Sequence, residues 1–236
     1  MARLPAALLN EFCELIEAAI RHWPGLGGVV IRRWWYALRL KRLGRGVLIS
    51  PGVRFYGHRH ISIGDDTHID LDCIIIAGRA LLESHEVRRL DNPAFTLAEG
   101  EVSIGKGVHI APRCLIVGHG GVQIGDYCGC TAGTRIFSIS NHYAGLADRS
   151  RRDVLFTTRA GPRSYVVGPV VLGRNVGVAL NAVVLPGTTL SDESFLAIGA
   201  VARGLIPPNS LAAGNPAVRV RDRFETSGAP GKQEGD

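Results

Sequence analysis

The sequence predicts a mainly β fold in which short parallel strands wind into a triangular prism, and three features of its 236 residues support this prediction. Aliphatic residues recur every six positions, small residues recur in step with them, and glycine is abundant. Thirty glycines beside only seven phenylalanines, without low-complexity sequence, indicate many tight turns rather than long helices. With 46 % hydrophobic residues, the chain can bury one substantial core in one or two domains.

The first 46 residues predict helices. Residues 4–23 place apolar side chains at helical spacing, and a Pro-Gly pair ends that run. A second helical stretch extends from about Val29 to Gly44, with aromatic residues between basic ones. Because the end of a stacked repeat exposes unpaired strands and apolar interior, we expect residues 1–46 to form a helical cap or leader.

The six-residue period begins at Val47 and contains two columns. In its most regular block, the aliphatic column is made of Leu172, Val178, Val184, Leu190, Leu196 and Ala202. The second column stands four residues later and is made mostly of small residues: Thr67, Cys73, Val108, Cys114, Cys128, Thr134, Val176, Ala182, Thr188, Ser194 and Ala200. Three six-residue units would close one triangular coil, with the aliphatic residue in the interior and the small residue in the narrow corner.

The cysteines and the N-terminus indicate in which cellular compartment the protein is expected. Four of the five cysteines fall in the interior columns, so we interpret them as small buried hydrophobic residues. Their odd number and the absence of a CxxC pair favour neither a disulfide framework nor a zinc ribbon. The N-terminus lacks the unbroken apolar core of a signal peptide, and no stretch has about 18 consecutive apolar residues. We therefore expect a cytoplasmic protein.

Two polar segments leave the period, at residues 77–101 and 140–165. Both are flanked by regular repeats, so each should loop out of a continuous prism that spans residues 47–221. Loops on a rigid scaffold are where function concentrates. Residues 222–236 have the composition of a disordered tail.

The repeats resemble those of the hexapeptide-repeat acyltransferases over roughly residues 47–221. The segments that carry the resemblance are "ISIGDDTHI", "VSIGKGVHIAP", "NVGVALNAVVLPGTTL" and "IPPNSLAAGNPAVRVR". The resemblance implies a left-handed parallel β-helix, assembly as a homotrimer, and acyl transfer from acetyl-CoA.

The pair Asn141-His142 begins the second polar segment, directly after a complete coil. An acceptor hydroxyl is almost wholly protonated at neutral pH, so its attack on a thioester needs a general base. Histidine has an ordinary pKa near 6.5, and a well-placed base contributes roughly 10²–10⁴-fold to the rate. Members of this family that acetylate sugars often use a histidine that leaves a coil in an "NH" or "GH" pair, which implies that His142, with Asn141, is catalytic.

The resemblance also implies a CoA groove between adjacent β-helices near the C-terminal coils. Alignment on the family's closing repeats puts the backbones of Leu180 and Ile198 against the pantetheine arm. Arg203, Arg219 and Arg221 are then candidates for the CoA phosphates, because guanidinium groups pair well with phosphate oxygens. A solvated basic surface is the alternative interpretation of these three arginines.

Three positions depart from the family pattern, and metal binding is not expected. Gly177 and Ala179 replace a common Trp and Gly, while Gly133 stands where many sugar acetyltransferases carry an Asn near the acceptor. The related γ-class carbonic anhydrases bind zinc through three histidines, but no similarly spaced pair follows His109 here. His119 and His142 are the residues that a zinc hypothesis would test.

Residues 21–45 are basic and aromatic. No acidic residue occurs between Glu17 and Asp65, whereas nine Arg or Lys do. This composition suits both a cap on the first coil and contact with an anionic membrane surface. Nucleic-acid binding is disfavoured, because no recognition motif accompanies the charge.

Together these features predict an acetyl-CoA-dependent O-acetyltransferase that acts on a carbohydrate hydroxyl, in a surface polysaccharide or its nucleotide- or lipid-linked precursor. N-acetylation of an amino sugar needs the same base and stays an alternative. A zinc-binding protein or a β-helical scaffold without catalytic activity is the alternative from a different class.

Overall fold

The computed structural model describes residues 6–150 and 163–225, with side chains described from residue 11 onward. The first residues of the expected leader, residues 151–162 of the second polar segment, and the expected tail from residue 226 lie outside this described part.

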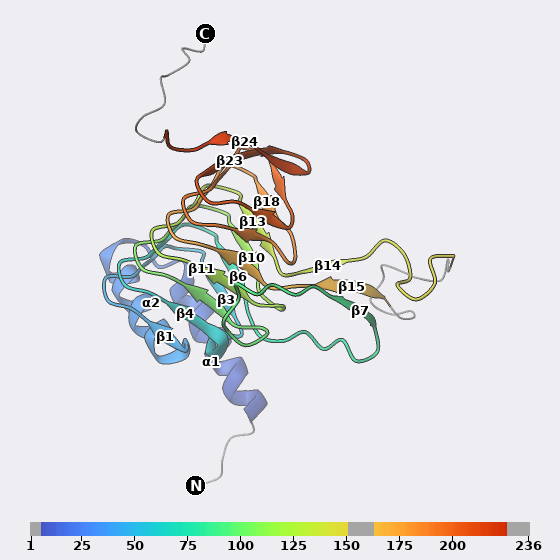
Figure 1. Cartoon of the computed structure of the whole chain (residues 1–236). Coiled ribbons are helices and arrows are strands. Elements are labelled where there is room, and N and C mark those ends of the chain that lie inside the picture. Colours follow the sequence, from blue (N-terminus) through green and yellow to red (C-terminus); the bar gives the residue numbers. More distant parts are fainter. Residues whose placement is uncertain (1–5, 151–162, 226–236) are drawn as a thin grey trace.

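Three parallel sheets form the walls of a prism (Figure 1). Sheet A contains, in ladder order, β1 (Arg42–Leu43), β4 (Ile61–Ile63), β8 (Val102–Ile104), β11 (Val122–Ile124), β16 (Val170–Leu172), β19 (Thr189–Leu190) and β22 (Leu205–Ile206). Sheet B contains β2 (Leu48–Ile49), β5 (His68–Ile69), β9 (His109–Ile110), β12 (Gly129–Cys130), β17 (Gly177–Val178), β20 (Phe195–Leu196) and β23 (Ser210–Gly214), closed by antiparallel β24 (Ala217–Asp222). Sheet C contains β3 (Arg54–Tyr56), β6 (Ile74–Ile76), β10 (Leu115–Val117), β13 (Arg135–Phe137), β18 (Val183–Val184) and β21 (Val201–Ala202).

The chain visits sheets A, B and C in turn, so each circuit adds one coil to the stack. Equivalent positions pair between coils: Ile116 of β10 lies opposite Ile75 of β6 on one side and Ile136 of β13 on the other. The architecture is a left-handed parallel β-helix with two N-terminal helices and two excursions, which confirms the predicted fold class.

The prism interior is filled by the two predicted columns. Every residue of the aliphatic block and of the small-residue column is buried. The four cysteines in these columns are buried and free, as expected. Burial raises the pKa of the Cys128 thiol to about 11, so this sulfur stays protonated at neutral pH and acts as a packing group.

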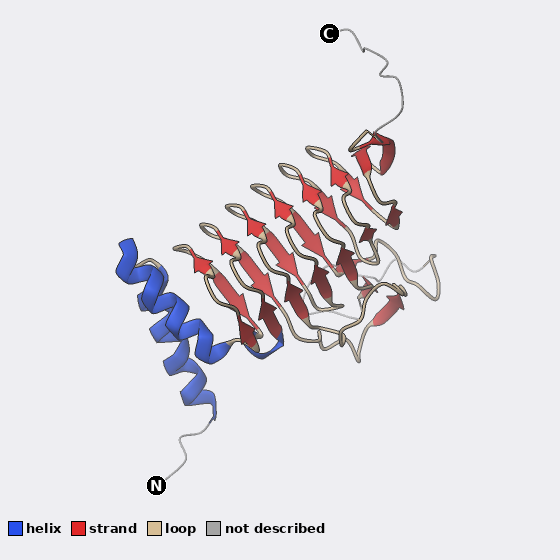
Figure 2. Ribbon diagram, turned by 60° about the vertical axis from the view of Figure 1, so that its left-hand side comes forward, coloured by secondary structure: helices blue, strands red, loops and turns tan. Residues whose placement is uncertain are grey.

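The two helices lie at one end of the prism (Figure 2). α1 (Ala6–Arg21) and α2 (Gly25–Arg39) form a hairpin, and the buried side chain of Arg32 fastens it to the first coil. Arg32 Nε donates to the Ile49 carbonyl at 3.0 Å, and Nη1 donates to the carbonyls of Trp23 at 2.7 Å and Ile20 at 3.3 Å. Within the described residues, neither helix is long and apolar enough to cross a membrane.

The three edges of the prism differ. Every turn between sheets B and C has four residues, from 50–53 in the first coil to 197–200 in the sixth. These turns use a left-handed residue; Gly52, at φ +80°, is one, and a Cβ there would lie 2.0 Å from Asp72 Oδ1. The edge between sheets C and A is irregular, and we call it the loop edge; its segments are 57–60, 77–101, 118–121, 138–169, 185–188 and 203–204. The loop edge therefore collects the departures from the repeat on one side of the molecule.

Candidate active site

The two long segments of the loop edge join into an arm that projects from the prism (Figure 1). In the arm, β15 (Ser164–Val167) pairs antiparallel with β14 (Ile139–Asn141) and parallel with β7 (Glu86–Arg89). The three strands come from both excursions, so the second excursion is held by the first. This small sheet is the platform for the candidate base.

His142 follows β14 directly and is fixed at two points. Its backbone N–H donates to the Ser164 carbonyl at 2.8 Å, which continues the ladder between β14 and β15. Its ring Nδ1 lies 2.8 Å from the Ala144 carbonyl. A proton on Nδ1 completes that hydrogen bond and leaves the lone pair of Nε2 available to accept a proton, which is the arrangement that a general base requires. Asn141 is exposed on β14, opposite Tyr165 in the register.

A carboxylate from the first excursion holds the loop that follows His142. Glu86 Oε2 accepts hydrogen bonds from the Leu146 backbone N–H at 2.6 Å and from Ser164 Oγ at 3.0 Å. Because Glu86 is 56 positions before His142, nothing in the local sequence indicates this contact. Glu86 therefore links the first excursion to the segments on both sides of the candidate base.

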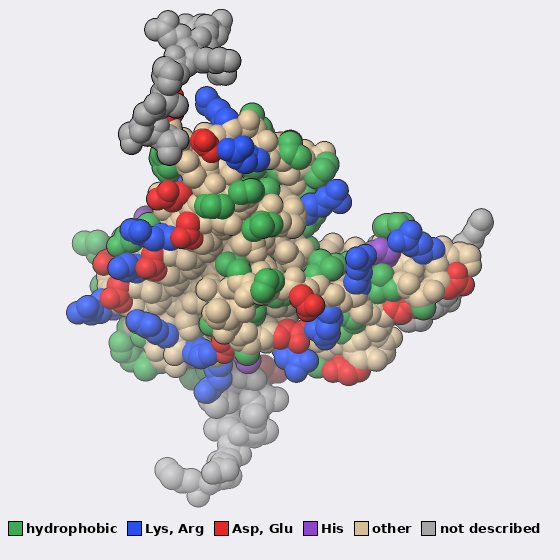
Figure 3. All heavy atoms as spheres, viewed as in Figure 1, with side chains coloured by type: hydrophobic (Ala, Val, Ile, Leu, Met, Phe, Trp, Pro, Cys, Tyr) green, Lys and Arg blue, Asp and Glu red, His purple; other side chains and the backbone are tan. Residues whose placement is uncertain are grey.

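A hollow of about 320 Å³ opens beside the imidazole. Among the described residues, its lining includes Val87, Arg88, His142, Leu146 and Arg149, so two arginines share this hollow with the imidazole. On the face drawn in Figure 3, a histidine side chain of the arm lies between Lys or Arg side chains. The charge of this hollow suits an anionic ligand such as a phosphate-bearing substrate.

The residues expected at the cofactor lie elsewhere on the prism. Leu180 and Ile198 are exposed in successive turns between sheets B and C, where the Gly199 N–H donates to the Leu180 carbonyl at 2.9 Å. Arg203 lies on the loop edge in the turn after β21. Arg219 and Arg221 are exposed on β24, which closes sheet B at the C-terminal end.

One chain therefore does not bring all the expected site residues together. His142 and Arg203 belong to the loop edge, whereas Leu180 and Ile198 lie on another edge of the same prism. Gly133, at the position where an acceptor-binding Asn was expected by resemblance, is a left-handed turn residue at φ +73°.

The structure also groups residues that were not expected to meet. His119 contacts the Gly78 carbonyl at 2.7 Å through Nδ1 and joins no metal-ligating group within the described residues. The cluster that could hold a metal is His68, Asp70 and His109. A signal was present in the sequence, because each histidine directly precedes an isoleucine of the aliphatic column, and removal of residues 77–101 makes their coils adjacent.

The sequence of this chain is similar to those of known acyltransferases. No family model matches it. It is 26 % identical over 186 residues to the dTDP-4-amino-4,6-dideoxy-D-glucose acyltransferase of Escherichia coli, covering 78 % of this chain and 82 % of that protein. It is 28 % identical over 138 residues to the putative colanic acid biosynthesis acetyltransferase WcaF of E. coli K12, covering 56 % and 76 %. The chain is therefore similar, over most of its length, to acyltransferases of the hexapeptide-repeat kind.

Solved structures share the fold of this hexapeptide-repeat protein. AntD, an N-acyltransferase from Bacillus cereus solved with dTDP and coenzyme A, superposes with a TM-score of 0.65 at 18 % identity, covering 82 % of this chain and 89 % of AntD. A hexapeptide-repeat acetyltransferase from Vibrio cholerae in complex with acetyl-CoA gives 0.55 at 18 % identity, covering 95 % and 92 %. A maltose O-acetyltransferase from Clostridium difficile gives 0.54 at 17 % identity, covering 91 % and 86 %.

Proposed function

We propose that this chain transfers an acetyl group from acetyl-CoA to a carbohydrate hydroxyl, with His142 as the general base. The observation that carries the proposal is the position of the imidazole on the arm, where Nδ1 lies 2.8 Å from the Ala144 carbonyl and 3.3 Å from the Ala144 nitrogen. The tautomer with the proton on Nδ1 leaves Nε2 to act as the base. The similarity to acyltransferases named for sugar substrates supports the acceptor class.

The chemistry needs no covalent acyl-enzyme. Nε2 of His142 takes the proton of the acceptor hydroxyl while its oxygen attacks the thioester carbonyl carbon. The resulting oxyanion collapses, the carbon–sulfur bond breaks, and the imidazolium returns the proton to the CoA thiolate. Two bound substrates held in this geometry supply the remaining rate enhancement.

A second copy of the chain would complete this site. The expected pantetheine contacts Leu180 and Ile198 lie on a different edge from His142, so a cofactor on that edge of one prism can meet the arm of its neighbour. We therefore propose a homotrimer with active sites between subunits, as the family resemblance implies. Light scattering on the purified chain tests this, and a monomer that turns over substrate at full rate would contradict it.

The cofactor proposal is tested by calorimetric titration with CoA and acetyl-CoA. Binding near one equivalent per chain is expected, weakened by the double variant Arg203→Glu and Arg221→Glu. The double variant Arg54→Glu and Arg59→Glu, exposed on the first coil, is the matched control and should bind as the original chain does. Absence of saturable binding would remove the acyltransferase proposal.

N-acylation of an amino sugar is the second candidate, because the E. coli relative that matches 78 % of this chain is named for an amino sugar. Two acceptors that differ in one group separate the candidates: dTDP-4-amino-4,6-dideoxyglucose and dTDP-6-deoxyglucose. Acylation of the amine alone supports N-transfer. Acylation of the hydroxyl compound, or of a maltose-type sugar, supports O-transfer.

We also propose that the helical hairpin contacts an anionic membrane surface. Four apolar residues at intervals of four run along α2 and are 61–85 % exposed: Leu26, Val30, Trp34 and Leu38. Phe12 and Leu15 of α1 are exposed as well. The adjoining segment carries basic residues and no acidic residue between Glu17 and Asp65, which complements anionic lipid headgroups.

Sedimentation with vesicles tests this contact. The full chain should bind vesicles that contain phosphatidylserine more strongly than phosphatidylcholine vesicles, and Trp34→Glu with Leu38→Glu should abolish the binding. Unchanged binding by the variant would contradict the proposal. Loss of self-association in the variant, without vesicle binding by the original chain, would instead assign this face to a second copy.

A further inference from the structure

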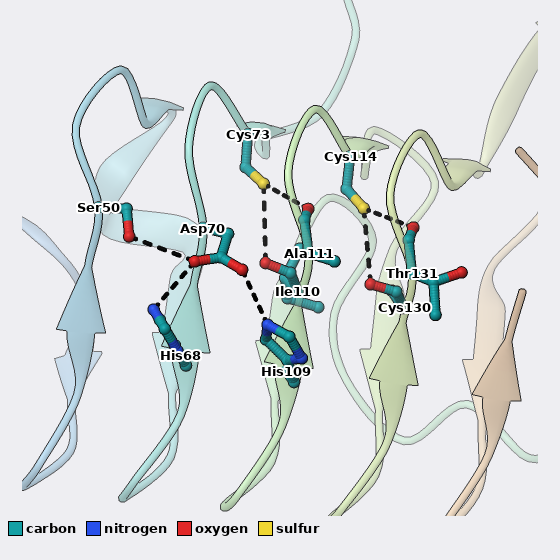
Figure 4. A network of polar contacts seen from close by, with 10 residues as sticks. All are labelled: Ser50, His68, Asp70, Cys73, His109, Ile110, Ala111, Cys114, Cys130 and Thr131. Atoms are coloured by element: carbon teal, nitrogen blue, oxygen red, sulfur yellow. Dashed lines mark hydrogen bonds and ion pairs between the residues drawn. The ribbon is translucent and has the colours of Figure 1, made fainter. Parts of the chain in front are cut away.

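The outer wall of sheet B carries a cluster with metal-ligating geometry. His68 begins β5, His109 begins β9, and the two residues are direct partners in the parallel ladder. Asp70 follows β5 and lies against both imidazoles, with Oδ1 3.0 Å from His68 Nε2 and Oδ2 2.9 Å from His109 Nε2 (Figure 4). One ligand atom from each residue lies within 4.8 Å of the other two.

From this convergence we propose a binding site for a divalent transition metal, with two imidazole nitrogens and one carboxylate oxygen as ligands. Two imidazoles and a carboxylate suit Zn²⁺ and its neighbours, whereas Mg²⁺ and Ca²⁺ prefer oxygen ligands. Neither the acyl transfer nor the arm uses these residues, so the site is separate from the candidate active site.

The dimensions of the cluster fit an ion of this size. With metal–ligand distances of about 2.1 Å, two ligands of a tetrahedral ion lie about 3.4 Å apart. The separations of 3.0 and 2.9 Å run from the two Nε2 atoms to different oxygens of Asp70. One ligand atom from each of the three residues lies within 4.8 Å of the other two, so shifts of the side chains bring the three atoms to the spacing of a bound ion. The side chains of His68 and His109 are 42 % and 55 % exposed, so their rings can rotate toward a shared ion.

A neighbouring hydroxyl orients the carboxylate, and the Cys73 thiol does not take part in the cluster. Ser50 Oγ lies 3.4 Å from Asp70 Oδ1 and helps to orient the carboxylate. The nearby Cys73 points into the prism, where its Sγ donates to the Ala111 carbonyl at 3.1 Å, so it does not join the cluster (Figure 4). Three protein ligands would leave the fourth position of a tetrahedral ion to water or another small ligand.

The place of the cluster in the fold suggests what the metal does. His68 and Asp70 belong to the second coil and His109 to the third, and the excursion at residues 77–101 leaves the chain between these two coils. A bound ion would therefore link the two coils across the point where the repeat is interrupted. A metal ion that binds the folded chain but not the unfolded chain raises the melting temperature of the protein.

The test is equilibrium dialysis of the full chain, stripped with a chelator, against Zn²⁺. One tightly bound ion per chain is expected, together with a rise in melting temperature, and Mg²⁺ should produce neither effect. Co²⁺ in place of Zn²⁺ should give the visible absorption of a site with nitrogen ligands. Failure to bind Zn²⁺ stoichiometrically would overturn the proposal, whatever the acyltransferase activity of the same sample.

Variants assign the binding to the cluster. Loss of a group that only orients a ligand typically costs about 10–100-fold in metal affinity, so His68→Ala or His109→Ala should weaken Zn²⁺ binding at least about 100-fold. Asp70→Asn keeps the shape of the side chain and should weaken binding as well, which covers the case where an alanine variant fails to fold. His60→Ala, exposed on the loop edge, is the control. Equal affinity in the control and in the cluster variants would place the metal elsewhere and overturn the assignment.

Discussion

The edge between sheets B and C and the loop edge are made by the same repeat but differ in how constant their connections are. The first has four residues in each of its turns, whereas the second has segments from two residues, 203–204, to 32 residues, 138–169. All described strands outside the three walls belong to the loop edge. A repeat fold can therefore keep one edge constant and concentrate its insertions on another.

Packing explains why the difference is tolerated. The walls carry the interior columns, and each strand pairs with the coils before and after it, so an insertion within a wall would break two ladders. An insertion at an edge leaves both ladders intact when its ends lie close together. The hydrogen bonds of Asn92, whose Nδ2 donates to the carbonyls of Pro169 and Thr188, then attach the first excursion to later coils.

The largest effect is expected inside the walls. Ile116 is buried in β10, and Ile116→Ala should lower the free energy of unfolding by about 2–5 kcal/mol through lost burial and a residual cavity. Chemical denaturation measures this change. Leu115→Ala, in the same strand but partly exposed, is the matched control and should cost clearly less. Equal costs would mean that the interior column does not hold the prism together.

A smaller effect is expected where the helices close the prism. Arg32→Met keeps most of the buried stem but removes the hydrogen bonds that Arg32 donates to the carbonyls of Ile49, Trp23 and Ile20. The Ile20 carbonyl still accepts from the Trp23 N–H. The expected loss is about 1–3 kcal/mol in the free energy of unfolding. Arg33→Met, which removes one hydrogen bond to the Gly44 carbonyl at a half-buried site, is the control. A destabilisation no larger than that of the control would show that the hairpin is not held by Arg32.

The arm should respond in activity rather than in stability. Glu86→Ala removes the acceptor that holds Leu146 and Ser164 beside the base, so kcat should fall roughly 10-fold while CoA affinity stays unchanged. Glu86→Gln retains an acceptor oxygen and should restore most of the rate. Glu83→Ala, exposed in the same excursion, is the control. An unaffected kcat in Glu86→Ala would remove the positioning role.

The smallest effect is a pH dependence at the helical cap. Burial disfavours the Glu17 carboxylate, but hydrogen bonds and charges from His58, Trp35 and Arg39 outweigh it, so the net effect lowers the pKa of Glu17 below 4.5. A lowered pKa in the folded state adds stability above pH 4.5, and this contribution is lost as the pH falls through the lowered value. Denaturation midpoints measured from neutral to acidic pH should show this loss, and Glu17→Gln should flatten it. An identical profile in the variant would contradict the assignment.

The walls could be predicted from the sequence because each position in a repeat experiences the same surroundings in every coil. The column that contains Ile75, Ile116 and Ile136 therefore indicated both the six-residue period and the burial of these side chains. The arm could not be predicted in the same way, since the pairing of β7 with β15 joins segments 78 residues apart that share no period. His142 could be chosen as a candidate from the sequence because it stands where the six-residue period stops. The hydrogen bonds of Glu86 to Leu146 and Ser164, which lie on both sides of His142, could not be predicted. His68 and His109 are neighbours in the ladder of sheet B. This contact can be predicted from the sequence only when the excursion between them is left out of the six-residue repeat.

Turnover of His142→Ala and His142→Gln with acetyl-CoA and an active sugar acceptor tests whether the loop edge presents His142 as the base. Because each variant removes the base, kcat should fall at least about 10²-fold in both. CoA affinity and melting temperature should be unchanged, and His119→Gln on the same edge should keep its activity. Turnover of His142→Ala at the original rate would contradict the claim and remove the base from the arm.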